Sequence, residues 1–115
     1  MKKSEKNSEN YLERIPARNT SIEWTADDNG IVTLNIHNTG VFNKIAQRLL
    51  KKPPVTYIHL DEHGSFAWQI ADGERDIIAL GVDVKNKFGD AAEPLYPRLA
   101  KFFQILDSYG FIMWK

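Results

Sequence analysis

At 115 residues, the chain has the length of one small domain, which buries roughly 65% of its unfolded surface around a single core. The 15 basic and 15 acidic side chains cancel to a formal charge of zero, which argues against a protein dedicated to binding duplex DNA. The absence of cysteine excludes disulfides, zinc–thiolate sites, iron–sulfur clusters and a thiol nucleophile. No signal-peptide core or membrane-length apolar stretch is present, so we expect a cytoplasmic protein with no membrane partner.

The first 20 residues are polar and rich in Lys, Glu, Asn and Ser. This composition predicts a loose N-terminal tail over residues 1–20, followed by a folded domain over residues 21–115. Tyr11, Leu12 and Ile15 are the exceptions in this segment, and they could dock it onto the domain.

The segment after this tail has the pattern of a β-hairpin. Ile22 and Trp24 alternate with polar neighbours, and the apolar alternation resumes over residues 31–36. Between them, Asn29-Gly30 is suited to the two positive-φ positions of a tight turn.

A helical period then appears over residues 41–52, which we expect to form a helix inserted before the third strand. Pro53 and Pro54 would end this helix. Its apolar residues share one face: Val41, Phe42, Ile45 and Leu49.

Residues 55–60 are typical of a third short strand. In an extended chain, Tyr57 and His59 project to one side of the sheet, and Ile58 and Leu60 to the other.

Two helices are predicted next. Asp61 is suited to cap a helix that runs to about Ala71, and Asp76 to cap a second helix that ends at Gly89. Gly81 lies on the apolar stripe of the second helix, where the lack of a side chain permits another backbone to approach closely.

The third helix is predicted from about residue 93 to residue 108, and residues 111–115 are left as a short extended tail. At 100° per residue, Phe103 and Tyr96 lie near 80° and 100° from Leu95, outside its ordinary core stripe. This flank therefore needs a second partner, which is either another segment of the chain or a bound peptide. The core stripe lies within about 40° of Leu95: Leu99, Phe102, Leu106 and Tyr109.

The order of elements is strand, strand, inserted helix, strand and three helices, which is an α+β pattern. His59, Glu62 and His63 could form a metal or acid–base cluster, but Asp61 between the two histidines has the position of a helix cap. We therefore expect no metal, no cofactor and no catalytic residue, and so no enzyme.

The stretch LDEHGSFAWQIADG, followed by RDIIALGVDVKNKFG and PLYPRLAKFFQILDSYGFI, resembles the coenzyme PQQ synthesis protein D (PqqD) family. The resemblance covers roughly residues 22–112. The inserted helix and Ala67 depart from that family's pattern. The matching residues include Leu60, Asp61, Gly64, Trp68, Asp72, Gly73, Gly89, Leu106, Gly110, Phe111 and Ile112.

The resemblance implies a winged-helix-like fold, in which a three-stranded antiparallel sheet is followed by three helices. It also implies a peptide chaperone, a recognition element for ribosomally synthesised and modified peptides. Such a protein binds the leader segment of a precursor peptide and presents it to a maturase, often a radical-SAM enzyme. The leader would add as a strand along residues 55–60 and pack against the third helix. The expected contacts are Tyr57, His59, Tyr96, Leu99 and Phe103.

Two other functions fit parts of the same pattern. A winged-helix nucleic-acid binder needs a basic recognition face, but the third helix offers only Arg98 and Lys101. A structural protein could instead use the exposed strand edge to form a homodimer.

Overall fold

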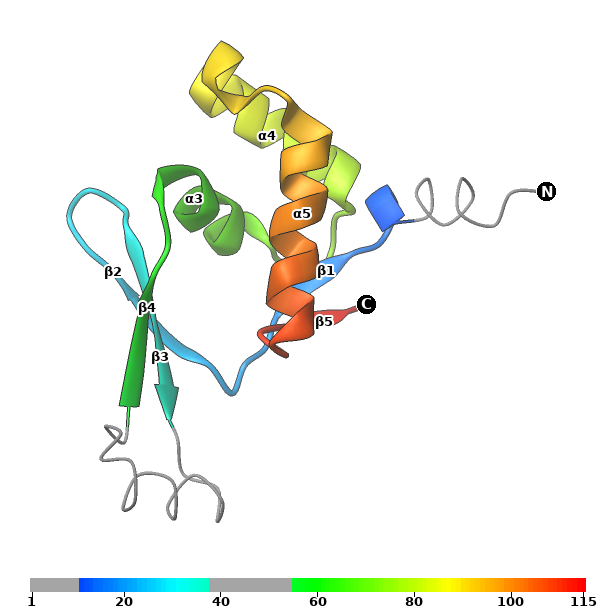
Figure 1. The fold of residues 1–115 in the computed structure, drawn as a ribbon. Coiled ribbons are helices and arrows are strands. Elements are labelled where there is room, and N and C mark those ends of the chain that lie inside the picture. The colour runs from blue at the N-terminus through cyan, green and yellow to red at the C-terminus, as the bar shows by residue number, and fades with distance from the viewer. Residues whose placement is uncertain (1–10, 38–54) are drawn as a thin grey trace.

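The computed structural model describes residues 11–37 and 55–115. The predicted α+β class is confirmed, with antiparallel strands and three helices arranged as Figure 1 shows. The helix expected over residues 41–52 lies outside the described residues. The described elements are β1 (Pro16–Arg18), β2 (Glu23–Ala26), β3 (Val32–His37), β4 (Val55–His59), α3 (Glu62–Ile70), α4 (Ile77–Phe88), the 3-10 helix η1 (Gly89–Ala92), α5 (Leu95–Ser108) and β5 (Ile112–Trp114).

The main sheet contains β2, β3 and β4 in that order, and both pairings are antiparallel. Leu34 at its centre is opposite Trp24 on one side and Ile58 on the other, and its side chain is fully buried. These three apolar residues face the helices, whereas their strand neighbours project from the opposite face.

The hairpin between β2 and β3 is confirmed, but its turn is longer than the two residues expected. The amide of Gly30 donates to the carbonyl of Asp27 at 2.9 Å, and the amide of Asp27 donates to the carbonyl of Ile31 at 3.0 Å. The Asp27 carboxylate also accepts from the amides of Asn29 and Ile31. Gly30 has a φ of 82°, so glycine supplies the left-handed position that closes the turn.

Both predicted helix caps are confirmed. The carboxylate of Asp61 accepts a hydrogen bond from the amide of Gly64 at 2.7 Å, and that of Asp76 accepts from Ala79 at 2.9 Å. Each bond satisfies an amide that has no partner inside its own helix. Gly89 ends α4 with a φ of 61°, as its position predicted.

A second, two-stranded sheet was not predicted. β1 pairs antiparallel with β5, with Ala17 opposite Met113. The tail predicted over residues 1–20 therefore includes a strand, and from Tyr11 onward this segment packs on the body of the protein. Tyr11 packs against the core and its ring contacts that of Trp114 at 5.4 Å, in agreement with the docking alternative.

The core lies between the main sheet and the three helices. Trp68 of α3 is completely buried, and its ring packs edge-on against Trp24 of β2 at 6.3 Å. Buried residues of α4 and α5 complete the cluster: Ile77, Leu80, Val84, Leu95, Leu99, Phe103 and Leu106. Among the described helices, none has the length and apolar character needed to cross a membrane.

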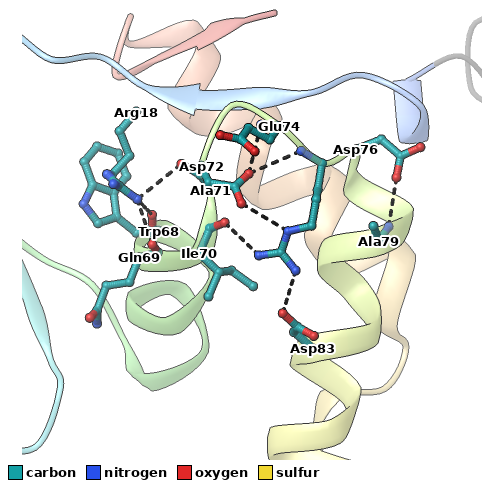
Figure 2. Close-up of polar contacts among 11 residues, drawn as sticks. Arg18, Trp68, Gln69, Ile70, Ala71, Asp72, Glu74, Asp76, Ala79 and Asp83 are labelled. Carbon is teal, nitrogen blue, oxygen red and sulfur yellow. Dashed lines mark hydrogen bonds and ion pairs between the residues drawn. The ribbon is translucent and has the colours of Figure 1, made fainter.

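Arginine side chains connect the end of α3 to its neighbours (Figure 2). The guanidinium of Arg18 on β1 donates to the carbonyls of Trp68, Gln69 and Ala71 at 3.0, 2.7 and 3.2 Å. Trp68 and Gln69 belong to the last turn of α3 and Ala71 follows its end, where a helix leaves carbonyls with few internal donors. Arg18 therefore connects the two-stranded sheet to the end of this helix.

The loop after α3 is held by a second arginine. Arg75 donates to the carboxylates of Asp72 at 3.2 Å and Asp83 at 2.7 Å (Figure 2). The Asp72 carboxylate also accepts from the amide of Glu74, and this bond, followed by the interactions with Arg75, lowers the pKa of Asp72. These contacts fix the turn between α3 and α4.

Candidate functional site

β4 is an edge strand of the main sheet. In the described part of the chain it pairs with β3 alone. The amide of Leu60 donates to the carbonyl of Val32 on the β3 side, and backbone groups alternate in direction along an antiparallel strand. The amide and carbonyl groups of Ile58 thus face β3, whereas those of Tyr57 and His59 face outward, where a further strand could bind them.

The side chains of Tyr57 and His59 lie on the outer face of the sheet, away from the helices. Tyr57 is 62% exposed, and His59 is exposed with its Nδ1 2.8 Å from the hydroxyl of Thr33. Ile58 between them packs against the core. Both residues are therefore on the edge strand as predicted, but they would contact only those side chains of an added strand that point away from α5.

The structure places the other three predicted contacts in or beside the core. Phe103 has no exposed surface and Leu99 is only 6% exposed. The ring of Tyr96 packs over Gly81 of α4, and its hydroxyl donates to the carbonyl of Ile78 at 2.9 Å. This differs from the expected groove wall because α4 covers the flank of α5 that carries Tyr96. The close approach predicted at Gly81 is present, but the neighbour is the side chain of Tyr96 and not the backbone of another element.

The opposite flank of α5 is open. A cavity of about 430 Å³ lies between this flank and the start of α3, directly after β4; we refer to it as the α3–α5 cavity. Residues with apolar side chains form its walls: Ala67, Val84, Leu95, Leu99, Phe102 and Ile105. Leu99 is therefore the one predicted contact on α5 that lines this cavity.

Glycine at position 64 shapes one wall of the cavity. A Cβ atom at Gly64 would lie 3.0 Å from the ring of Phe102 and 3.0 Å from the carboxylate of Asp61. The lack of a side chain thus allows the Phe102 ring to approach the capped first turn of α3. Ile105, one turn further along α5, is 46% exposed, so the apolar surface continues past the cavity.

Charged groups lie at the rim of the cavity. Arg98 and Lys101 are exposed residues on successive turns of α5, and Asp61 lies on the α3 side. One nitrogen of Arg98 donates to the carbonyl of Ala91 at 2.8 Å. Lys101 forms no ion pair with any residue that the structure describes. The α3 side of the rim carries the acidic Asp61, one oxygen of which accepts from the Gly64 amide, whereas the α5 side carries two basic side chains.

The three histidines have separate partners. His59 bonds to Thr33, His37 lies 3.0 Å from Glu23, and the ring of His63 packs on Phe88 at 4.0 Å. Within residues 11–37 and 55–115, no group of three His, Asp or Glu side chains is placed to hold a metal ion. Asp61 acts as the helix cap, as the sequence predicted.

Sequence reasoning missed Phe102 and Ile105 as candidate ligand contacts. It placed Phe102 in the core stripe and Phe103 on a flank that needs a second partner, from the chain or from a peptide, whereas Phe103 is fully buried and Phe102 is half-buried. The spacing of Leu95, Leu99 and Phe103 at four-residue intervals is the sequence signal that could have located the buried row.

Comparison of the chain with protein-family models gave no match, and neither did comparison with curated proteins or with solved structures. The resemblance to the PqqD family is thus carried by the residue pattern alone.

Proposed function

We propose that this protein is a non-catalytic peptide-binding chaperone that takes up an extended peptide along the edge of β4 that has no strand partner in the described part of the chain. The peptide is the leader segment of a ribosomally synthesised precursor, and a separate maturase, such as a radical-SAM enzyme, modifies the rest. The domain is winged-helix-like and of the PqqD kind in this proposal. The observation that carries it is an edge strand that leads, two residues after its end, into an apolar cavity between α3 and α5.

The edge and the cavity have complementary roles. A strand added to β4 would receive main-chain hydrogen bonds from the outward groups of Tyr57 and His59, which supply affinity without regard to sequence. Alternate side chains of that strand would point to the helical side of the sheet, where Phe102 and Ile105 offer apolar contacts. The cavity would therefore supply selectivity.

The binding experiment uses fluorescence anisotropy with leader peptides from short reading frames beside this gene. Ile105→Ala should weaken binding severalfold because it removes exposed apolar surface beside the cavity. Ile78→Ala is the matched control, since Ile78 is 42% exposed against 46% for Ile105 and lies on the outward face of α4. Absence of binding below high-micromolar concentration, or equal effects of the two substitutions, would contradict the proposal.

Peptide N-methylation tests the strand geometry separately. Methyl groups on alternate amides that face β4 should abolish binding, because each one removes a main-chain donor. Methyl groups on the intervening amides should have little effect. If both sets act equally, the peptide does not bind as a strand.

A homodimer through β4 is the competing use of the same edge. Sedimentation of the free protein and of its peptide complex distinguishes the two. A dimer that persists when peptide is in excess would contradict the chaperone proposal.

A further inference from the structure

The rim of the α3–α5 cavity has an uneven charge distribution. Arg98 and Lys101 lie towards the N-terminal half of α5, whereas Ile105 and Tyr109 lie towards its end. Ile105 and Tyr109 are 46% and 69% exposed. One end of the open flank is therefore basic and the other apolar.

The change from basic to apolar residues along α5 has a defined direction relative to β4. Figure 1 shows β4 and α5 running in opposite directions, with the start of α5 beyond the end of β4 and next to α4. Asp61 and Gly64, which follow β4, line the α3–α5 cavity together with Arg98 and Lys101. The basic end of the flank is therefore nearer to the His59 end of β4 than to the start of this strand.

We infer that the preferred ligand is a peptide with acidic residues followed by an alternating apolar segment. This inference rests on the proposed function. Both pairings in the main sheet are antiparallel, and antiparallel pairs outnumber parallel ones two- to threefold in proteins. An antiparallel ligand begins at the His59 end of β4, so its first residues lie on the side of Arg98 and Lys101 and its later residues lie on the side of the apolar end.

The side chains of Lys101 and Arg98 are available to bind acidic residues of a ligand. Lys101 has no ion-pair partner among the described residues, and Arg98 uses a single nitrogen in the hydrogen bonds described for it. The whole chain has a formal charge of zero, so any preference for acidic ligands must come from local placement and not from net charge. Two exposed ion pairs together change an affinity by roughly 2- to 30-fold.

Three labelled synthetic peptides of equal length test the inference by anisotropy. The first has two aspartates followed by valine and phenylalanine at alternate positions; the second has the same residues in reverse order; the third has lysine in place of aspartate. The first should bind roughly 2- to 30-fold tighter than the third, and this advantage should fall in high salt. It should also bind tighter than the second.

Charge reversal in the protein provides the reciprocal test. Lys101→Glu should remove the preference for aspartate and improve binding of the lysine peptide. Lys115→Glu is the control, because it makes the same change in net charge at an exposed residue outside the cavity. An equal loss in both variants would show long-range attraction only and would overturn the inference.

The outcomes separate this inference from the proposed function. If all three peptides bind with equal affinity, the charge preference is wrong and the peptide groove stands. If the reversed peptide binds best, the order of acidic and apolar residues is wrong. If none of the three binds and neighbouring leaders also fail, the proposed function itself is overturned.

Discussion

The ring of Tyr96 on α5 lies so close to Gly81 on α4 that a Cβ atom at position 81 would be 2.5 Å from it. The Tyr96 hydroxyl donates to the carbonyl of Ile78 at 2.9 Å and keeps the ring in this place. The two contacts determine how α4 and α5 pack on each other. They also determine which flank of α5 is closed and which faces the α3–α5 cavity.

Gly81→Ala should destabilise the protein by about 1–3 kcal/mol, even though alanine favours a helix by about 1 kcal/mol over glycine. The reason is the overlap with Tyr96. In a Tyr96→Ala background the same substitution should become neutral or stabilising, since the ring is gone. Urea unfolding of the four proteins measures this double-mutant cycle. If Gly81→Ala stabilises the protein in both backgrounds, a side chain at position 81 does not overlap with the Tyr96 ring.

Ser65 joins α3 to the main sheet. Its buried hydroxyl accepts from the amide of Val32 at 2.8 Å and donates to the carbonyl of Leu60 at 3.3 Å. Ser65→Ala should cost about 1–3 kcal/mol of unfolding free energy, because two backbone groups lose their partner. Ser21→Ala, at an exposed position, should change stability by less than about 0.5 kcal/mol. Equal values for the two variants would be evidence against the bridging role.

Arg18 should stabilise the folded protein through its hydrogen bonds to the C-terminal end of α3. Arg18→Met keeps much of the aliphatic stem but removes the donors to the carbonyls of Trp68, Gln69 and Ala71. We expect a loss of about 1–3 kcal/mol in thermal or chemical unfolding, as for hydrogen bonds from a charged donor. Arg18→Lys should recover only part of this, because an ammonium group lacks the planar fork. Full recovery by lysine would show that charge alone matters.

The Asp72 carboxylate should stabilise the folded protein at all pH values above its ordinary pKa and lose this effect in stronger acid. Its pKa is lowered from the ordinary value of 3.8, first by the Glu74 amide and then by Arg75. The folded state therefore holds the proton less tightly than the unfolded state. The resulting stabilisation is complete above pH 3.8 and is lost as the pH falls through the lowered pKa.

A carboxyl-detected NMR titration measures this pKa directly. The midpoint of Asp72 should lie below 3.8 in the native protein and rise towards that value in Arg75→Met. The change should be incomplete, because the Glu74 amide still donates to the carboxylate. An unchanged midpoint would show that Arg75 has no part in the shift.

Local signals located most of the elements correctly. Asp61 and Asp76 predicted the starts of α3 and α4, because a cap bonds to an amide only three residues away. Gly89 predicted the end of α4 for a similar reason. The hairpin was also found, although the Asp27 side chain makes the turn longer than its Asn-Gly pair suggested.

The β1–β5 pair could not be found in this way. Both strands have three residues, and they lie at opposite ends of the chain. A three-residue strand has too short a pattern to recognise, and its pairing depends on the rest of the fold bringing the two segments together. The polar composition of the first 20 residues therefore concealed a strand.

Local sequence patterns were sufficient to predict the α+β class, the approximate limits of the three described helices and an apolar arc on the last helix that is too wide for one partner. The packing of α4 on α5 alone decided that the flank with Tyr96 is closed and the flank with Phe102 and Ile105 is open. The physical reason is that caps and periodicity depend on residues three or four positions apart. The choice between two flanks of one helix depends on contacts between segments that are distant in the chain, such as Gly81 and Tyr96.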